Sequence, residues 1–456
     1  MKYSKCKLLL AASICAALLA GCSNRADAPK ILDMTFVPQS PVPTNTDVHV
    51  TAQVEGSNLS YNWKITGGIL REVQMHSGQL TPEETVAVTE SGQDNVGAII
   101  GPLGYTFLTV SPNALHDIVT HPAIEAVFIN SSDSLSVTAD DIAIRDWVEG
   151  GGALYASGRA AEYVRTLWPN RITFPKPDPY AGSANPADDL IQACIVDDPA
   201  QQSLGFDSLD LTYPSYSWPP VIATGGATTP IITADASSVV NIDLIENLPP
   251  GEDFEHMPVA MYFAHGDGIV VFTSFHYQPG LSSAETALLD YLAALVVMHP
   301  LKLRSHDMAD MAGYFPYMDF VGLTTTDRQA DFSFEIAGAD DVFLILNARM
   351  GALDFSVTGP GDLHQDVSGP APITMAFPNV ADGEWSVSVK AISMSVAEVL
   401  PFVLSVAARS KDLQLVTSVP EVIWRTPMDA GTYTITLRAI DDRYRVDEMI
   451  VGIKVE

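Results

Sequence analysis

Ser157 and His276 are the residues of this 456-residue chain whose types could support nucleophilic catalysis, because each lies at the end of a short apolar segment typical of a buried strand. A histidine can take the proton of a serine hydroxyl, and a carboxylate can hold the histidine in position. Asp133 or Asp267 could supply that carboxylate. Ser157 lacks the Gly-x-Ser-x-Gly frame that relieves crowding at a strand-to-helix turn, which disfavours this chemistry. A hydrolase that uses Ser157 and His276 is therefore the alternative function, and a non-catalytic role is favoured.

The cysteines provide no better nucleophile. Cys6 and Cys15 lie in an N-terminal leader that is expected to be removed, and Cys22, at the end of this leader, is expected to be modified. Cys194 is therefore the one unmodified cysteine expected in the mature chain. A single thiol cannot form an intramolecular disulfide. A lone cysteine is more often a small buried apolar residue than a nucleophile, and we expect Cys194 to be buried.

The sequence predicts no metal site and no cofactor. His116 and His121 lie five residues apart without an acidic or cysteine partner that would complete a zinc site. Residues 133–136 have leucine where the Asp-x-Ser-x-Ser metal motif needs its first serine, and residues 101–104 lack the spacing of a phosphate-binding loop. No EF-hand loop is present, so calcium on a cluster of acidic residues remains only an alternative.

The charge balance excludes one class of partner. Lysine and arginine total 24 and aspartate and glutamate total 55, which gives a formal net charge of −31. A chain this acidic repels phosphate backbones and anionic lipid surfaces. We therefore expect no nucleic-acid partner.

The N-terminus has the features of an export signal. Lys2, Lys5 and Lys7 precede an apolar run over residues 8–20 that is too short to cross a bilayer comfortably. Loss of this leader takes the formal charge from −31 to −34. Because no later segment has an uninterrupted apolar run of membrane-spanning length, any membrane attachment is expected to come from lipid.

The end of the leader, Leu19-Ala20-Gly21-Cys22, resembles the bacterial lipobox, in which the cysteine is acylated and becomes the new N-terminus. The resemblance implies that residues 1–22 are a lipoprotein signal peptide and lipobox and that Cys22 carries the lipid. An ordinary secretory signal with a chance cysteine is the alternative. Ser23 follows the cysteine, which favours the outer membrane over the inner membrane. We expect a cell-envelope protein, with its periplasmic or surface location open.

The candidate catalytic residues lie in a region with alternating strand and helix patterns. Residues 107–110, 126–130, 153–157 and 269–275 are short apolar segments typical of buried strands, and amphipathic helical patterns accompany them. We expect an α/β domain with a doubly wound sheet over residues 85–300. Residues 174–257, rich in Pro, Asp, Ser and Gly, are not assigned to any element.

The sequence segments of this region resemble those of the class I glutamine amidotransferase-like fold, particularly its ThuA-like branch. His276 matches the family's histidine, but Gln278 stands where the family has glutamate and Gly158 stands where it has its catalytic cysteine. The resemblance thus implies a degenerate site of Gly158, His276 and Gln278 without amidotransferase activity. We expect Gly158 at a strand-to-helix turn near His276, with the Ser157 side chain pointing away from His276.

Strand patterns of alternating apolar and polar residues occur at both ends of the chain. Residues 59–68 resemble the middle of a PKD or Ig-like module, and residues 422–436 resemble its continuation. We expect residues 31–72 and 419–456 to form one split β-sandwich, with two separate incomplete β units as the alternative. After a linker around residues 302–326, residues 327–410 resemble a pre-peptidase C-terminal type of β-sandwich.

The predicted fold class is therefore α/β plus all-β, with a doubly wound amidotransferase-like domain flanked by β-sandwiches. The predicted function is that of a lipid-anchored cell-envelope protein whose amidotransferase-like domain is non-catalytic and serves binding or assembly. Its expected partners are the membrane, through the N-terminal lipid, and an envelope protein or carbohydrate ligand.

Overall fold

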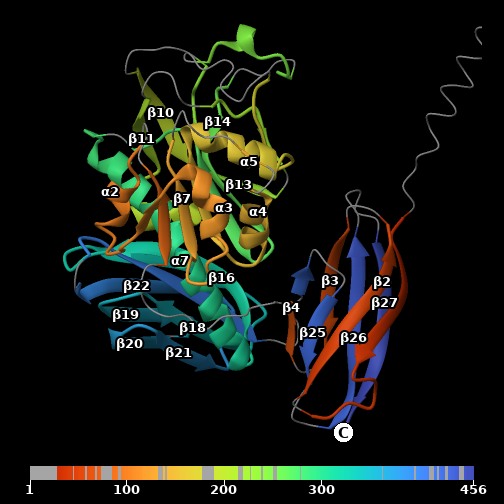
Figure 1. The fold of residues 1–456 in the computed structure, drawn as a ribbon. Helices are drawn as coiled ribbons and strands as arrows, with labels where there is room; N and C mark the ends of the chain where they lie inside the picture. The colour runs from red at the N-terminus through yellow and green to blue at the C-terminus, as the bar shows by residue number, and fades with distance from the viewer. Residues whose placement is uncertain are drawn as a thin grey trace, which may run out of the picture. The chain divides into compact units, whose positions relative to one another are not determined.

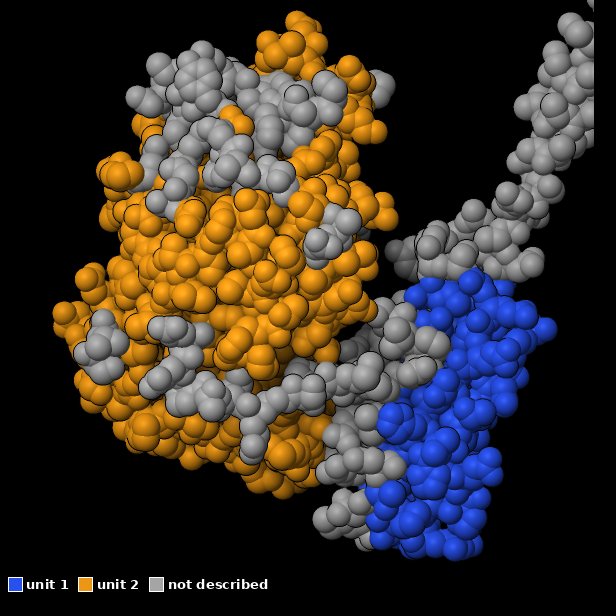
Figure 2. Space-filling model, viewed as in Figure 1, with its two compact units in different colours: residues 1–73, 410–456 blue, residues 74–409 orange. Residues whose placement is uncertain are grey.

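The computed structural model describes most of the chain from residue 28 onward. Cys22, Asp133 and Gln278 lie outside the described residues, as does the whole segment 1–22. The chain divides into two compact units, residues 1–73 with 410–456, and residues 74–409 (Figure 2). The described residues are 28–44, 46–56, 59–66, 69–72, 85–90, 94–131, 137–138, 141–176, 189–213, 219–225, 227–237, 240–249, 254–277, 279–361, 363–394, 397–409, 415–417, 421–426, 430–440 and 446–456.

The first unit contains two four-stranded antiparallel sheets, and each combines strands from both ends of the chain (Figure 1). Val48 pairs with Trp424 in one sheet, and Trp63 pairs with Leu437 in the other. Trp63 and Trp424 are both fully buried. The sheets have the orders β1 (Lys30–Val37), β2 (Asp47–Glu55), β25 (Glu421–Arg425), β4 (Ile69–Glu72), and β24 (Leu415–Thr417), β3 (Ser60–Ile65), β26 (Gly431–Ile440), β27 (Val446–Val455).

The second unit contains a nine-stranded sheet of mixed direction. Five strands run parallel to their neighbours, in the order β15 (Gly268–Thr273), β8 (Ala153–Ser157), β7 (Ala126–Ile129), β5 (Val86–Thr89), β6 (Leu108–Val110). Beyond β15 the sheet continues with antiparallel strands, in the order β14 (Met257–His265), β13 (Thr228–Ala234), β10 (Asp189–Ile195), β11 (Ser208–Tyr213).

The expected α/β class is therefore met by a sheet of mixed direction, in which one half is parallel and the other half is antiparallel. The unassigned segment 174–257 contributes β10, β11 and β13 to the antiparallel half. A tight hairpin at Gly266 then reverses the chain between β14 and β15. Gly266 has φ +59°, and a Cβ atom there would lie 2.2 Å from the carbonyl oxygen of Glu149, so only glycine fits. This turn makes β14 antiparallel to β15, where a helical crossover would have made the two strands parallel.

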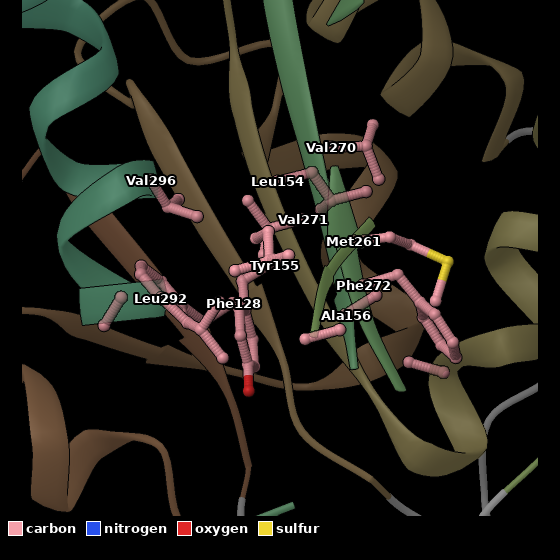
Figure 3. Packing of buried hydrophobic residues seen from close by; sticks show 14 of the residues in the cluster. Phe128, Leu154, Tyr155, Ala156, Met261, Val270, Val271, Phe272, Leu292 and Val296 are labelled. Carbon is pink, nitrogen blue, oxygen red and sulfur yellow. The ribbon is translucent and has the colours of Figure 1, made fainter. Parts of the chain in front are cut away.

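Helices cover both faces of the nine-stranded sheet. Figure 3 shows Leu292 and Val296 of α7 (Ser283–Met311) on one side of the sheet, with Met261 and Phe272 directed to the other. The other helices and short strands are α2 (Gly97–Ile100), α3 (Leu115–Ile118), α4 (Ile142–Glu149), α5 (Ala161–Leu167), α6 (Asp198–Leu204), the 3₁₀ turns η1 (Pro112–Ala114), η3 (Gly158–Ala160) and η4 (Ile242–Leu244), and the pair β9 (Ile172–Thr173) and β12 (Ala223–Thr224).

Helix α7 begins with a capping box, in which Ser282 and Glu285 each accept a hydrogen bond from the other's backbone N–H. By length and composition alone α7 could cross a membrane. Its apolar residues are instead largely buried within the second unit, where it packs against the nine-stranded sheet and against β16 and β23. The helix is therefore a core element of this unit.

The predicted linker over residues 302–326 is wrong. Helix α7 continues to Met311, and β16 begins at Phe315. The apolar residues at the end of β16 enter the same buried cluster as the nine-stranded sheet, so the α/β part and the sandwich form one compact unit. The sandwich has the sheet orders β16 (Phe315–Thr324), β23 (Leu400–Arg409), β18 (Asp341–Asn347), β21 (Ile373–Pro378), and β17 (Gln329–Ile336), β22 (Gly383–Ser393), β19 (Ala352–Gly359), β20 (Leu363–Pro370).

Candidate functional site

The candidate site lies at the carboxyl ends of the parallel strands, the edge at which open α/β sheets bind ligands. Ser157 ends β8, and Gly158 starts the turn into η3 and α5. Gly158 has φ +47°, a left-handed conformation that favours glycine. His276 follows the neighbouring strand β15. A sharp turn therefore follows β8, and the residue that starts it, Gly158, has no side chain.

Ser157 is fully buried, and its hydroxyl donates a hydrogen bond to the carboxylate of Asp94. The same hydroxyl lies 3.4 Å from the carbonyl oxygen of Ile129 on β7. Within the described part of the chain these are its two hydrogen-bond partners, and His276 is not one of them. The geometry needed for a serine–histidine pair is thus not formed.

Asp94 is the site residue that the sequence analysis missed. It is 3% exposed and lies between β5 and α2. Its second carboxylate oxygen accepts a hydrogen bond of 3.1 Å from the backbone N–H of Tyr277. Burial raises the pKa of Asp94 to about 6, although the hydrogen bond from Ser157 acts in the opposite direction. Asp94 therefore links the end of β8 to the segment after β15.

Asn130 holds the Asp94 segment in place. Its side-chain amide donates to the carbonyl oxygen of Thr89 at 2.6 Å, and its backbone N–H donates to the Thr89 hydroxyl at 2.8 Å. The side-chain oxygen of Asn130 accepts a hydrogen bond of 3.0 Å from the backbone N–H of Val96. These bonds tie β5, β7 and the start of α2 together. No motif in the sequence marks Asp94 or Asn130 as site residues.

His276 is 5% exposed, and burial lowers its pKa to about 4. Its ring is therefore neutral at physiological pH. The Nδ1 atom is buried and has no hydrogen-bond partner among the described residues. A catalytic histidine needs a carboxylate to stabilise its protonated form, and among the described residues no carboxylate is hydrogen-bonded to the His276 ring, because Asp94 bonds to Ser157 and to the backbone of Tyr277 instead.

Asp267 cannot be the carboxylate of a triad. It precedes β15, whereas His276 follows the other end of this strand, which separates them by roughly 20 Å at the rise of an extended chain. Its carbonyl oxygen instead lies 2.7 Å from His299 Nε2. The prediction of Asp267 as a third catalytic group is wrong, and Asp133 lies outside the described residues.

The expectation that Cys194 is buried is also wrong. Cys194 is exposed on β10, because Ile191, Ala193 and Ile195 occupy the buried face of the same strand and alternate with it. In the described ranges no group of three or more histidine, cysteine, aspartate or glutamate residues could hold a metal ion.

Comparisons with known proteins return structural neighbours only. No protein-family model and no curated protein matches the chain. A cytoplasmic protein from Salmonella typhimurium shares 10% identity over 46% of this chain and 98% of its own, with a TM-score of 0.31. A putative ThuA-like protein from Parabacteroides merdae shares 13% identity over 47% of this chain and 90% of its own, with a TM-score of 0.31. A β-galactosidase from Bacillus circulans sp. alkalophilus shares 10% identity over 67% of this chain and 41% of its own, also with a TM-score of 0.31. These neighbours have varied folds, and one of them is ThuA-like. All three similarities are too weak to support an argument about function.

Proposed function

We propose that this protein is a lipid-anchored component of a bacterial cell envelope whose α/β domain is non-catalytic and holds a binding partner, an envelope protein or a carbohydrate. The anchor is proposed at Cys22, on the strength of the lipobox-like residues 19–22. The outer membrane is the favoured location because Ser23 follows the cysteine.

One observation carries the non-catalytic role. The Ser157 hydroxyl is buried and bonded to Asp94, and glycine occupies the turn where the related enzymes place their nucleophile. A hydroxyl whose hydrogen bond goes to a buried carboxylate is not activated by a histidine, and it cannot reach a substrate without opening this network. The accessible group beside this network is the partly exposed side chain of Tyr277, which follows the buried His276. The Tyr277 ring and hydroxyl can bind a partner by packing and hydrogen bonding.

Labelling of the full-length protein with a serine-directed fluorophosphonate tests the non-catalytic role. We expect no label at Ser157, while a serine hydrolase in the same tube is labelled fully. A label on Ser157 that disappears in His276→Ala would overturn the proposal in favour of the exported hydrolase.

Capture from an envelope extract tests the binding role. The bait is the full chain carrying Cys22→Ala, so that it stays out of the membrane, and it is crosslinked before washing. We expect the same partner with the bait and with Arg165→Gln, which removes a half-buried ion pair with Glu162 on α5. Tyr277→Ala should lose the partner. Equal capture by Tyr277→Ala would place the binding surface away from this edge of the sheet.

A further inference from the structure

A cavity of about 240 Å³ lies within unit 2, between α7, the nine-stranded sheet and β16. Four residues of α7 line it, and their spacings of four, four and three positions place them on one face of the helix. They are Tyr291, Leu295, His299 and Lys302. The other lining residues are Tyr262 on β14, Ile269 on β15, Asp319 and Val321 on β16, and Asp197 and Pro199 after β10. All of them belong to the described ranges, and we call this space the Tyr291 cavity.

The hydroxyl of Tyr291 is an unused hydrogen-bonding group in this cavity. The side chain is 1% exposed, and none of the described residues forms a hydrogen bond with its hydroxyl. Burial raises the pKa of Tyr291, and the nearby Asp197 carboxylate and Tyr262 act in the same direction. A hydroxyl taken out of bulk water without a partner is costly unless a ligand or a water molecule satisfies it. The cavity therefore contains a free hydroxyl with a carboxylate near it.

Asp197 is the carboxylate of this cavity that lacks an opposite charge. One of its oxygens accepts a hydrogen bond of 3.1 Å from the backbone N–H of Ala200. Burial raises the pKa of Asp197, and the neighbouring Asp198 raises it further, although the bond from Ala200 acts in the opposite direction. In the described part of the chain no lysine, arginine or histidine forms an ion pair with Asp197. A cation in the cavity would therefore be attracted to this carboxylate.

The basic side chains of the wall act on other groups. Burial raises the pKa of Asp319, but its hydrogen bond to His306 at 2.9 Å and the charge of Lys302 outweigh that effect and lower it. Burial lowers the pKa of His299 to about 3, so its ring is neutral at physiological pH. Lys302 is not among the groups that shift the pKa of Asp197. The positive charge that Asp197 lacks is thus not supplied by the described residues of the wall.

We propose that the Tyr291 cavity binds a small primary amine as its ammonium ion. The ammonium group donates hydrogen bonds to the second oxygen of Asp197 and to the hydroxyl oxygen of Tyr291. The hydrocarbon part packs on the aliphatic side chains of the wall, and it is short because the cavity is smaller than the usual site for a drug-sized ligand. Lys302 lies about 16 Å from Tyr291 along the axis of α7, and its charge disfavours a second ammonium group. The ligand is therefore a monoamine.

Calorimetric titration of the full-length protein in detergent tests this proposal. The probes are propylamine, butylamine and cyclohexylamine, each paired with the alcohol of the same carbon skeleton, together with β-alanine. We expect saturable binding of at least one amine at neutral pH and none of its alcohol. Asp197→Asn and Tyr291→Phe should each weaken that binding by at least about ten-fold, the effect of losing one hydrogen bond to a charged group. Asp198→Asn, which changes the exposed acid at the next position, should bind amines like the original protein.

Both variants of the cavity should fold. Asparagine at position 197 can keep the hydrogen bond from Ala200, and Tyr291→Phe removes only a hydroxyl that has no partner among the described residues. Thermal unfolding without ligand checks this. The proposal is overturned if no amine binds, if an alcohol binds as well as its amine, or if either variant binds amines as tightly as the original protein. Tighter binding of β-alanine than of every amine would also overturn it, in favour of a zwitterion site that includes Lys302.

Discussion

The Ser157 hydroxyl donates its hydrogen bond to the carboxylate of Asp94, a residue 63 positions earlier in the chain. This bond joins the end of β8 to the segment before α2, and Asp94 in turn holds the backbone of Tyr277 beside His276. The candidate site is therefore organised around a buried carboxyl group.

Asp94 should make the protein less stable as pH rises. Its pKa is raised from 3.8 to about 6 by burial, so the folded state holds the proton more tightly than the unfolded state. The free energy of unfolding should fall by about 3 kcal/mol between pH 4 and pH 6 because of this group. Asp94→Asn should remove that contribution, measured as the difference from the original protein in urea unfolding across this range. Ser157→Ala should extend the fall to higher pH, because the hydrogen bond from Ser157 lowers the pKa of Asp94. Parallel pH curves for Asp94→Asn and the original protein would contradict this account.

His276 should make the protein less stable as pH falls, which is opposite to the effect of Asp94. Burial lowers its pKa from 6.5 to about 4, so the folded state resists protonation. The stability associated with the neutral ring is present above pH 6.5 and is lost as pH falls toward 4, by about 3 kcal/mol. His276→Gln should remove this loss and reveal the opposing slope of Asp94 in the same unfolding series. If His276→Gln lost as much unfolding free energy between pH 6.5 and pH 4 as the original protein, the ring would not be buried as described.

The two units should respond separately to loss of their buried tryptophans. Trp63 is fully buried in the first unit, and Trp385 is fully buried in the sandwich of the second. Replacement of either by alanine should cost about 3–5 kcal/mol. Calorimetry should show a lower transition temperature for the first unit alone in Trp63→Ala, and for the second alone in Trp385→Ala. A single transition that moves equally in both variants would contradict independent units.

Removal of the strands after residue 418 should destabilise the N-terminal strands. The buried side chains of Val48 and Val50 on β2 lie on a strand that pairs with β25, and Trp63 lies on β3 beside β26. Truncation would expose apolar surface worth about 1.5–3 kcal/mol for each large side chain. Limited proteolysis should then digest residues 31–72 while residues 85–409 stay intact. Resistance of the N-terminal segment would mean that it folds without the C-terminal strands.

Lipidation at Cys22 should decide where the protein is found. We expect Cys22→Ala to move the protein from the detergent-extracted membrane fraction to the soluble fraction. A variant that remains on membranes after a high-salt wash would contradict attachment by lipid alone.

The strands could be predicted where the local pattern is strong. Residues 153–157 were expected as a strand and form β8, and the alternating residues at both chain ends form β2, β3, β26 and β27. Alternation is visible in the sequence because a strand with one buried face places every second side chain toward the core. The turn at Gly158 is predicted only by the resemblance to the amidotransferase-like fold. Its φ of +47° is a conformation that residues with a Cβ atom rarely adopt.

The partners of the site residues were decided only by the tertiary structure. Nothing near Ser157 in the sequence indicates Asp94, and nothing in residues 189–195 shows that the Cys194 side faces solvent. The antiparallel half of the sheet and the packing of α7 against both the sheet and the sandwich were missed for the same reason. Local patterns determine which face of an element is apolar, but which other element covers that face depends on contacts between segments that are distant in the sequence.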